Sequence, residues 1–497
     1  MIDLITNIFG DFAVFVPMGF LVLGALLSPA VQLLTKNRTA TWGFSLLMVA
    51  LSMVVNILMM TDYGGTEAYV NDYYGIAYNA YSALMMLLFQ VVLFLAVLVS
   101  NASVETTRLH AGAYYALLMG ATLGMMTVVG SNDLITIFVG VELTSISSYA
   151  AVSMKRKDSR AAEAAVKYVV IGGMSTALTL YGISMIYGLA HTTVISEIAI
   201  NDISLMYIIG LVCMIAGYGF KIAAVPFHMW APDVYEGSAT PVSMFLATGS
   251  KKMGLAVFFQ IFLVLFIGTK VCAGMQEVQY VFAIIAAFTM TVGNVVAIAQ
   301  SNIKRMLAYS SIAQAGYILI VMAVMTEYAT SAGIFHMFTH VFMKGGAFLV
   351  VGALICAGVG EKISDYRGLA KRAPLLAAAM MLFLFSLAGI PPLAGFTSKF
   401  FLFSGAIVGP EGGVSSQWVW LALVAILNSA ISLYYYARVV KAMYIEKGTS
   451  CEKIVVPKAF VLAILICVVF VIVLGVYPQF LYGFCENAAN VLFQNLL

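Results

Sequence analysis

Charged residues are scarce in this chain. Only 9% of its 497 residues are Asp, Glu, Lys or Arg, whereas soluble globular domains carry about 25%. So few charges cannot coat a water-facing surface, which excludes a soluble enzyme. The 25 basic and 22 acidic residues nearly balance and form no long basic run, which argues against nucleic acid as a partner.

Sequence patterns for cofactors are also missing. The six cysteines include no Cys-x-x-Cys pair, the spacing expected of an iron–sulfur or zinc site. The sequence has no phosphate-binding loop, haem-attachment motif or Ser/His/Asp pattern, and no Gly-x-Gly-x-x-Gly follows a strand-like segment. We therefore expect no redox cofactor and no metal in this chain itself.

Hydrophobic residues, in contrast, make up 62% of the chain and gather in long continuous runs. A transmembrane helix needs about 20 mostly apolar residues, and these runs are unlike the short alternating segments of a membrane β-barrel. The sequence predicts an all-α polytopic membrane protein that forms a single transmembrane domain over residues 1–497. Its fourteen predicted spans are 11–33, 41–60, 78–100, 111–130, 133–154, 164–189, 204–225, 239–267, 277–300, 306–326, 329–357, 374–408, 417–445 and 457–481.

The basic residues between these runs predict the orientation, since cytoplasmic loops are rich in Lys and Arg. With fourteen spans both termini share one side, and the odd-numbered loops share the other. The even-numbered loops hold only Lys270, whereas the odd-numbered loops hold Lys36, Arg38, Arg108, Lys155, Arg156, Lys157, Arg160, Lys304, Arg305, Lys362, Arg367, Lys371, Arg372, Arg438, Lys441, Lys447, Lys453 and Lys458. The N-terminus lacks the positive segment of a cleaved signal peptide. We expect a multi-pass protein of the cell membrane with both termini outside the cytoplasm.

Several ionisable residues fall inside the runs, where each costs at least about 2.5–3.5 kcal/mol even on the lenient insertion scale. They are Glu142, Lys167, Lys221, Lys251, Lys252, Lys344 and Lys399. Lys167 and Lys252 have charged or polar neighbours, and we interpret them as reaching toward an interface. That interpretation fails for Glu142 and Lys221, which are distant from charged loops or beside a helix break. The set favours an internal polar pathway, and lysine suits a proton carrier because a desolvated ammonium can release its proton, unlike arginine.

A second group of titratable residues lies in the run 329–357. His336, His340 and Lys344 recur every four residues and therefore share one helix face. Because imidazole titrates near neutral pH, the spacing favours a file of proton-carrying groups. Two alternatives remain open. The histidines can pack against Thr and Ser hydroxyls, or they can bind zinc, although a third carboxylate or thiolate ligand is not near them in the sequence.

Proline interrupts two of the later runs, at Pro226 and at Pro391-Pro392, and glycine pairs at 172–173 and 345–346 precede them. Interrupted helices at corresponding positions of two halves are typical of inverted-repeat transporters. In the sequence alone, these glycine pairs and prolines are only a weak indication of an internal repeat.

Three segments carry a family resemblance that extends over nearly the whole chain. They are the stretch 217–252, which begins Gly217-Tyr-Gly-Phe-Lys-Ile-Ala-Ala-Val-Pro226, the stretch Asn302-Ile-Lys-Arg-Met-Leu-Ala-Tyr-Ser-Ser-Ile-Ala, and the stretch Gly389-Ile-Pro-Pro-Leu-Ala-Gly-Phe-Thr-Ser-Lys-Phe. They resemble the antiporter-like subunits of respiratory complex I. The wider family includes multisubunit Na+/H+ antiporters of the Mrp type and membrane-bound hydrogenases.

Within that family the chain most resembles the N subunit (NuoN type). The segment from Asn428 to Tyr444 is in the style of that subunit, Lys399 replaces the glutamate of the M subunit, and the long lateral helix of the L subunit has no counterpart after the last run. Two features depart from many bacterial N subunits: the face formed by His336 with its two neighbours, and Gln314 at a place where histidine is common. The archaeal reduced-deazaflavin (F420H2-type) dehydrogenase, which feeds methanophenazine, is therefore a second resemblance.

The resemblance implies two inverted five-helix repeats, about 111–267 and about 277–445, in which the seventh and twelfth helices are broken. It implies that Glu142 and Lys221 form the switch pair of a first half-channel. Lys251 is then the central lysine, and Lys399 is the terminal group of a second half-channel. His336, His340 and Lys344 would connect the two.

The implied function is proton translocation by one membrane subunit of a translocase that transfers electrons from NADH or a reduced deazaflavin to a quinone or methanophenazine. Iron–sulfur clusters, flavin and the quinone-type acceptor would then belong to partner subunits, and the partners would include further antiporter-like subunits and membrane lipid. An ion-translocating subunit of a Na+/H+ antiporter or of a membrane-bound hydrogenase remains an alternative. A solitary transporter for an organic solute is disfavoured, because the charged residues are spread over five spans rather than gathered round one pocket.

Overall fold

The computed structural model describes residues 10–62, 69–71, 75–107, 109–155, 158–200, 203–268, 275–409, 413, 416–448 and 452–494. Among the residues used above, Arg108, Arg156, Lys157 and Lys270 lie outside the described residues, as do Cys272 and Cys451.

Helices dominate the described chain. In order the elements are η1 (Gly10–Phe15), α2 (Val16–Thr35), α3 (Arg38–Asp62), β1 (Tyr69–Asn71), β2 (Ile76–Tyr78), α4 (Ala80–Ser100), α5 (Ala111–Gly130), α6 (Leu134–Ser153), α7 (Ser159–Ala190), η2 (Ile195–Glu197), α8 (Leu205–Ile222), α9 (Trp230–Gly237), α10 (Thr240–Phe245), η3 (Leu246–Ser250), α11 (Lys251–Phe258), η4 (Phe259–Gly268), α12 (Met275–Ala299), α13 (Ile303–Ile318), α14 (Ile320–Val324), α15 (Glu327–Cys356), η5 (Ile363–Tyr366), α16 (Leu369–Arg372), α17 (Pro374–Ala388), α18 (Ala394–Gly405), α19 (Val419–Tyr444), α20 (Lys458–Val476) and α21 (Gln479–Gln494).

The long apolar runs form helices because a helix satisfies its own backbone hydrogen bonds where lipid offers no partner. Thirteen helices in the described part of the chain are long and apolar enough to cross a membrane. Each corresponds to one predicted run. The remaining run, 374–408, is not one helix but two, α17 and α18. The break falls at Pro391-Pro392, where the sequence predicts an interruption of this run.

A short antiparallel pair of strands departs from the all-α prediction. Strand β1 pairs with β2, with Val70 opposite Ala77, in the connection between α3 and α4. Each strand has three residues, so the pair is a local feature beside an otherwise helical bundle.

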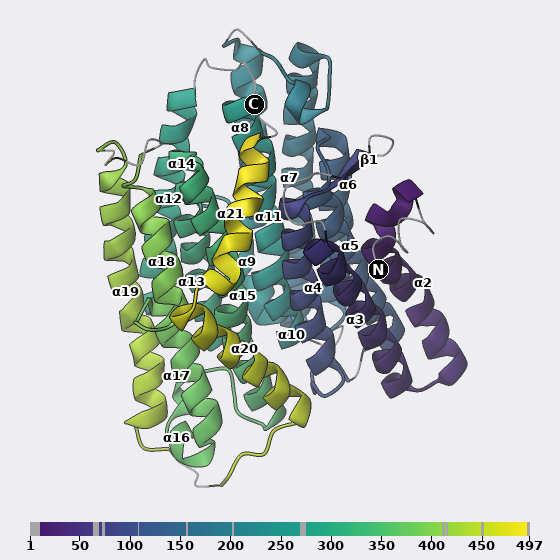
Figure 1. Cartoon of the computed structure of the whole chain (residues 1–497). Coiled ribbons are helices and arrows are strands. Elements are labelled where there is room, and N and C mark those ends of the chain that lie inside the picture. The colour runs from purple at the N-terminus through teal and green to yellow at the C-terminus, as the bar shows by residue number, and fades with distance from the viewer. Residues whose placement is uncertain are drawn as a thin grey trace.

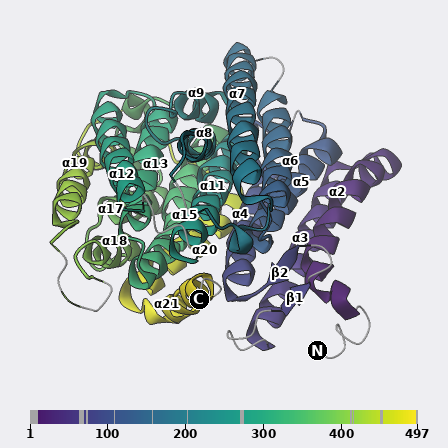
Figure 2. The same cartoon turned by 90° about the horizontal axis from the view of Figure 1, so that it is seen from above.

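Most of the long helices run side by side, whereas α20 crosses the bundle obliquely (Figure 1). Seen from above, α2, α3, α5 and α6 form one flank, and α12, α17, α18 and α19 lie on the opposite flank (Figure 2). Helix α15 lies between them and packs against α10, α13, α17, α18, α20 and α21. This central place explains why the titratable face of α15 is buried.

Two of the predicted runs are interrupted at their prolines. Helix α8 ends at Ile222, where Ala223 has a left-handed backbone with φ of 56°, and α9 begins at Trp230. Helix α17 ends at Ala388, where Gly389 has φ of 93°. A residue of this conformation stops a helix and leaves its last carbonyl groups without helical partners. Both interruptions therefore bring backbone acceptors into the interior of the bundle.

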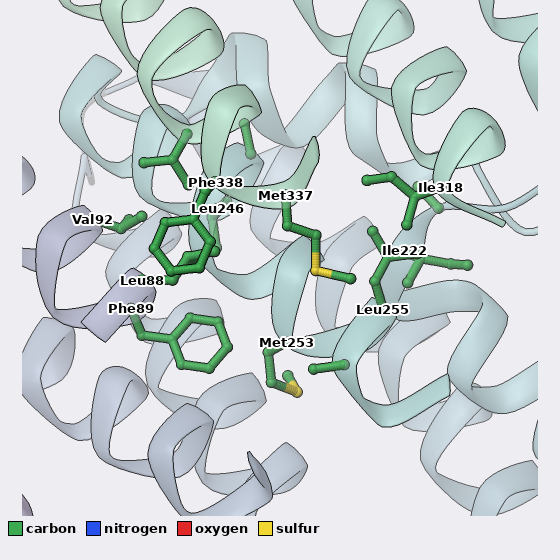
Figure 3. Close-up of a cluster of buried hydrophobic side chains, with 14 of the residues drawn as sticks. Leu88, Phe89, Val92, Ile222, Leu246, Met253, Leu255, Ile318, Met337 and Phe338 are labelled. Carbon is green, nitrogen blue, oxygen red and sulfur yellow. The ribbon is translucent and has the colours of Figure 1, made fainter. Parts of the chain in front are cut away.

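The centre of the bundle is apolar. Figure 3 shows buried side chains of α4, namely Leu88, Phe89 and Val92, gathered with Met253 of α11 and Phe338 of α15. Lys251 and Lys252 directly precede Met253 in α11 and are also buried. The candidate site therefore consists of a few buried charged side chains surrounded by apolar packing.

Candidate functional site

The interior of the bundle holds an unusual number of ionisable side chains. Those of the predicted set that are buried are Lys221, Lys251, Lys344, Lys399, His336 and His340. Glu142 is partly buried. Lys252 is only 1% exposed, so its interpretation as a residue reaching toward an interface is wrong. Lys167, in contrast, is partly exposed and pairs with Glu163 at 2.7 Å and Asp233 at 2.6 Å.

Lys221 lies in the last turn of α8, directly before the interruption. Its ammonium donates a hydrogen bond to the hydroxyl of Ser145 on α6, and its Nζ lies 5.4 Å from the centre of the Tyr149 ring. Glu142, one turn before Ser145, accepts a hydrogen bond of 2.8 Å from the Thr176 hydroxyl. Glu142 thus lies on the same face of α6 as Ser145, the residue that Lys221 contacts from α8. The structure shows no direct ion pair between Glu142 and Lys221.

Lys251 begins α11 where the π-helical turn η3 ends. Its side chain is 1% exposed, and its Nζ has no hydrogen-bond partner among the described residues. The centre of the Tyr235 ring lies 5.6 Å from this atom, within the range of a cation–π contact. A buried ammonium without an acceptor is costly, so this position favours proton release or contact with water.

The ring centres of His336 and His340 lie 6.4 Å apart on α15. The Nδ1 atom of His336 is 2.9 Å from the Ser398 hydroxyl, and its Nε2 atom is 3.0 Å from Oε1 of Gln314. Because protein groups occupy both nitrogens of His336, the zinc alternative loses its basis. No three His, Cys, Asp or Glu side chains in the described part of the chain are grouped so that they could hold a metal. Neither ring nitrogen of His340 has a hydrogen-bond partner there.

A chain of hydrogen bonds links His336 to Lys399. The Oε1 of Gln314 accepts a hydrogen bond from Nε2 of His336, and its Nε2 donates to the carbonyl of Leu387 at 3.2 Å. Lys399 donates to the same carbonyl at 2.8 Å. Ser398, which contacts the other nitrogen of His336, directly precedes Lys399 in α18. The structure therefore brings two of the predicted site residues together through two intermediates.

The interruption between α17 and α18 creates the binding place of the Lys399 ammonium. Besides the Leu387 carbonyl, Nζ donates to the carbonyl of Ala388 at 3.3 Å and to the Ser429 hydroxyl at 2.9 Å. The centre of the Tyr317 ring lies 4.9 Å away. These acceptors are the free carbonyls of the last turn of α17, which an unbroken helix would have used itself.

Lys399 also lines a cavity of about 450 Å³ between α18 and α19. Ser429 and Ser404 share the cavity wall, and most of the other lining side chains are apolar. Phe396, Phe400 and Leu433 are exposed on the outside of the bundle. The ammonium thus sits between the interior network and an opening at the flank.

Lys344 lies one helical turn after His340 on α15. Its ammonium donates to the carbonyl of Leu307 at 3.1 Å and to the hydroxyl of Ser310. Both acceptors belong to α13.

Three of the buried ammonium groups, those of Lys221, Lys344 and Lys399, share one kind of environment, made of neutral oxygens rather than carboxylates. Lys221 contacts Ser145, Lys344 contacts Ser310, and Lys399 contacts Ser429. A serine hydroxyl can accept a hydrogen bond from an ammonium and can donate one to a neutral amine. This arrangement can therefore serve both protonation states, as proton transfer requires, whereas a carboxylate partner favours only the charged one.

These serines and Gln314 are the site residues that sequence reasoning did not select. The signal available was the presence of small polar residues inside apolar runs. That signal is weak, because many serine and threonine hydroxyls in transmembrane helices bond their own backbone, as Ser100 does to the Ala96 carbonyl.

A separate network of ion pairs lies at the end of the bundle that carries the basic loops. At its centre is Lys304, whose side chain is 0% exposed and lies 3.2 Å from Glu361 and 3.6 Å from Glu105. Lys304 was counted among the loop charges, and the structure instead buries it in the first turn of α13. Burial raises the pKa of Glu105, but Lys304 and Lys155 and the backbone amide of Thr240 outweigh burial and hold it below the ordinary glutamate value.

Comparison with known proteins places this geometry in context. Residues 131–432 match the family described as NADH:quinone oxidoreductase/Mrp antiporter, transmembrane. The chain is 43% identical to the F(420)H(2) dehydrogenase subunit N of Methanosarcina mazei over 81% of this chain and 82% of that one. It is 40% identical to the NADH-quinone oxidoreductase subunit N of Moorella thermoacetica over 84% of this chain and 87% of that one.

One solved structure shows the same fold in an assembled enzyme. A chain of the respiratory complex I from Thermus thermophilus, solved with bound aureothin, superposes with a TM-score of 0.78. It is 27% identical, and the match covers 94% of this chain and 98% of that one.

Proposed function

This chain belongs to the NADH:quinone oxidoreductase/Mrp antiporter family, and we propose that it carries protons through the membrane along its buried lysines and histidines. It is an antiporter-like membrane subunit N of the kind found in complex I and in F(420)H(2) dehydrogenase. The observation that carries the proposal is the set of interior ammonium groups held by hydroxyls and carbonyls.

In this proposal the redox chemistry takes place elsewhere in the assembly. The relatives are named as subunits of an F(420)H(2) dehydrogenase and an NADH-quinone oxidoreductase, so the electron donor is a reduced deazaflavin or NADH, and the acceptor is a quinone or methanophenazine. Flavin and iron–sulfur clusters belong to partner subunits. The subunits of Na+/H+ antiporters and membrane-bound hydrogenases remain the second reading, since they share the family.

The proposed path begins at Glu142 and Lys221 and continues to Lys251. Glu142 lies one turn before Ser145 on α6, and Ser145 contacts Lys221. A change of charge at Glu142 therefore alters the electrostatic potential at Lys221. From Lys251 the path continues into the second half of the chain.

In the second half the path reaches the face of α15 that carries His340, His336 and Lys344. Gln314 and the Leu387 carbonyl connect this face with Lys399. Lys399 then exchanges its proton at the open flank. At Lys221, Lys344 and Lys399 a serine hydroxyl can solvate the side chain in both of its protonation states.

Helix lengths support two repeats of five helices, about 111–267 and about 277–445. The third helix of each is the longest, α7 with 32 residues and α15 with 30 residues. The fourth of each is interrupted, as α8 with α9 and as α17 with α18. Counting α17 and α18 as one broken span gives fourteen crossings, and both termini then lie outside the cytoplasm.

The surroundings of Glu142 support the proposal that a partner subunit covers the flank formed by α6 and α7. Its neighbours on this flank, Val139, Ile146 and Met174, are exposed in the single chain by 56%, 64% and 64%. A carboxylate facing lipid at this depth costs at least about 2.5 kcal/mol. A neighbouring membrane subunit that covers the flank and offers hydrogen-bond donors to Glu142 removes this cost. We propose that further antiporter-like subunits belong to the same assembly.

The test uses the assembled complex, purified through a tag on this chain and reconstituted into liposomes. Electron transfer from NADH or reduced deazaflavin to a quinone analogue, and the accompanying proton uptake, are measured for the wild type and for Lys221→Met. The matched control is Lys167→Met, which changes a lysine that is partly exposed in the structure. We expect Lys221→Met to lose most proton uptake and the control to keep it. Proton uptake driven only by a sodium gradient, with no redox subunits in the preparation, would instead establish the antiporter reading.

A further inference from the structure

A second polar cavity lies on the side of the bundle opposite the ion-pair network. Its volume is about 190 Å³, enough for roughly six water molecules. The lining comes from the ends of α4, α5 and η4 and from the connections after α5 and α7, and its polar members are Asn79, Ser131, Asn132, Ser196 and Gln260. None of the residues in the proposed proton path lines this cavity.

Gln260 is the feature that points to a ligand. It is 8% exposed, and its Nε2 donates to the backbone carbonyl of Ser131. Its buried Oε1 has no hydrogen-bond partner among the described residues, although buried polar atoms almost always have one. The residue stands in the π-helical segment η4, a local widening of the helix that is frequent at functional sites.

The cavity reaches toward Lys251 along a single helix. Tyr81 also lines the cavity, and its hydroxyl donates to the carbonyl of Ala256 at 3.2 Å. Ala256 lies five residues after Lys251, which is about 7 Å along the helix axis. The polar surface of the cavity therefore ends about one and a half helical turns from the central lysine.

An apolar layer fills that remaining distance. Met253 and Leu255 are buried and lie between Lys251 and Ala256 on α11, and Figure 3 shows the buried side chains of Leu88 and Phe89 from α4 beside Met253. A constriction of apolar side chains blocks ions and protons by excluding water.

We propose that this cavity is a hydrated vestibule, which admits water from the non-cytoplasmic side to the first half of the chain and is closed below Tyr81 by the apolar layer. The inference extends the proposed function, because it gives the first half an outward mouth separate from the opening at Lys399. Water inside the vestibule supplies the missing donor for Gln260 Oε1.

The experiment tests hydration directly and does not depend on proton pumping, so the vestibule and the proposed function can fail separately. In the assembled complex with the six native cysteines replaced, Gln260→Cys, Ser196→Cys and Val257→Cys are exposed to a small charged thiol reagent from the non-cytoplasmic side. Ser196 is exposed and serves as the positive control, whereas Val257 is buried in the same helix as Gln260 and serves as the matched negative control.

We expect Gln260→Cys to react at least about tenfold faster than Val257→Cys, since a dry position reacts only through rare local opening. Equal, slow reaction of both variants beside a reactive Ser196→Cys would overturn the vestibule. Hydroxyl-radical footprinting of the unmodified complex provides a second measurement, which does not depend on the folding of any variant. Tyr81 should be oxidised at least about tenfold faster than Tyr218, which is equally buried, and equal protection of both tyrosines would again overturn the proposal.

Discussion

Replacing Lys399 by arginine separates a proton carrier from a fixed positive charge. The ammonium of Lys399 has three oxygen acceptors, the carbonyls of Leu387 and Ala388 and the hydroxyl of Ser429. A guanidinium has five N–H donors and can satisfy the same acceptors, and the adjoining cavity of about 450 Å³ leaves room for its larger head. The variant should therefore fold and assemble.

The expected loss follows from the chemistry of the two side chains. In water the ordinary pKa of arginine lies about two to three above that of lysine, which is about 10.4. Releasing the proton therefore costs about 3–5 kcal/mol more from arginine, which corresponds to a fall of about two to three orders of magnitude in the deprotonated population. If Lys399 must release its proton in each cycle, Lys399→Arg should lose nearly all proton translocation.

The assay is redox-driven proton uptake by the complex in proteoliposomes, with the amount of assembled complex measured in parallel. Lys167→Arg is the matched control, because Lys167 is partly exposed and paired with Glu163 and Asp233. An arginine there keeps both ion pairs and should leave uptake unchanged. Full proton uptake by Lys399→Arg, together with failure of Lys399→Ala, would show that Lys399 only balances charge and would refute this reasoning.

Four further predictions concern other parts of the molecule. Glu142→Gln should reduce redox-driven proton uptake without loss of assembly, and uptake equal to wild type would remove Glu142 from the path. Lys304→Met should destabilise the complex by about 3–5 kcal/mol, because it removes the fully buried partner that Glu105 and Glu361 share, and thermal unfolding followed by a tryptophan signal measures this. Since the pKa of Glu105 is lowered in the folded chain, its contribution is complete above about pH 4.3 and fades as the pH falls below that value; a melting temperature of wild type that is flat between pH 5 and pH 3 would contradict it. Lys157→Cys should react with an impermeant thiol reagent only from the cytoplasmic side and Gly413→Cys only from the other, and reaction from one side alone would refute the orientation.

The positions of the membrane helices could be predicted from the sequence because lipid imposes one simple requirement. A run of about 20 apolar residues must become a helix, and thirteen of the runs did so. The run 374–408 was predicted as broken from Pro391-Pro392, but its division into two helices with free carbonyls at Leu387 and Ala388 depends on tertiary contacts with Lys399. Proline in the sequence indicates that the helix is interrupted. Only the folded structure shows that Lys399 donates to the carbonyl groups left free by the interruption.

Burial of individual charges was harder to predict. Lys252 and Lys304 each stand beside a second basic residue, which suggested an exposed position, yet they are 1% and 0% exposed. The reason lies in distant parts of the chain. Glu105 and Glu361, on connections far away in the sequence, meet Lys304 in the folded protein, and no local pattern encodes that meeting.

The hydrogen-bond partners of the buried lysines could likewise not be predicted from the sequence. Nothing in the spacing of Ser145, Ser310 or Ser429 shows that they contact lysines of other helices, and Ser145 and Ser310 also bond carbonyls of their own helices. The cross-helix contacts to Lys221, Lys344 and Lys399 arise from how six helices pack. The buried lysines could be selected from the sequence, whereas the neutral oxygens that contact Lys221, Lys344 and Lys399 could not.

Lys251→Met offers the most direct test of proton transfer through the buried lysines. Lys251 has no hydrogen-bond partner among the described residues, so methionine of similar volume removes the titratable group and leaves no broken hydrogen bond behind. The measurement is the number of protons translocated per electron pair, determined in proteoliposomes of the assembled complex. A fall in that number, or a parallel stop of electron transfer and proton uptake that an uncoupler does not relieve, is what we predict. An unchanged number of protons at an unchanged rate of electron transfer would contradict it.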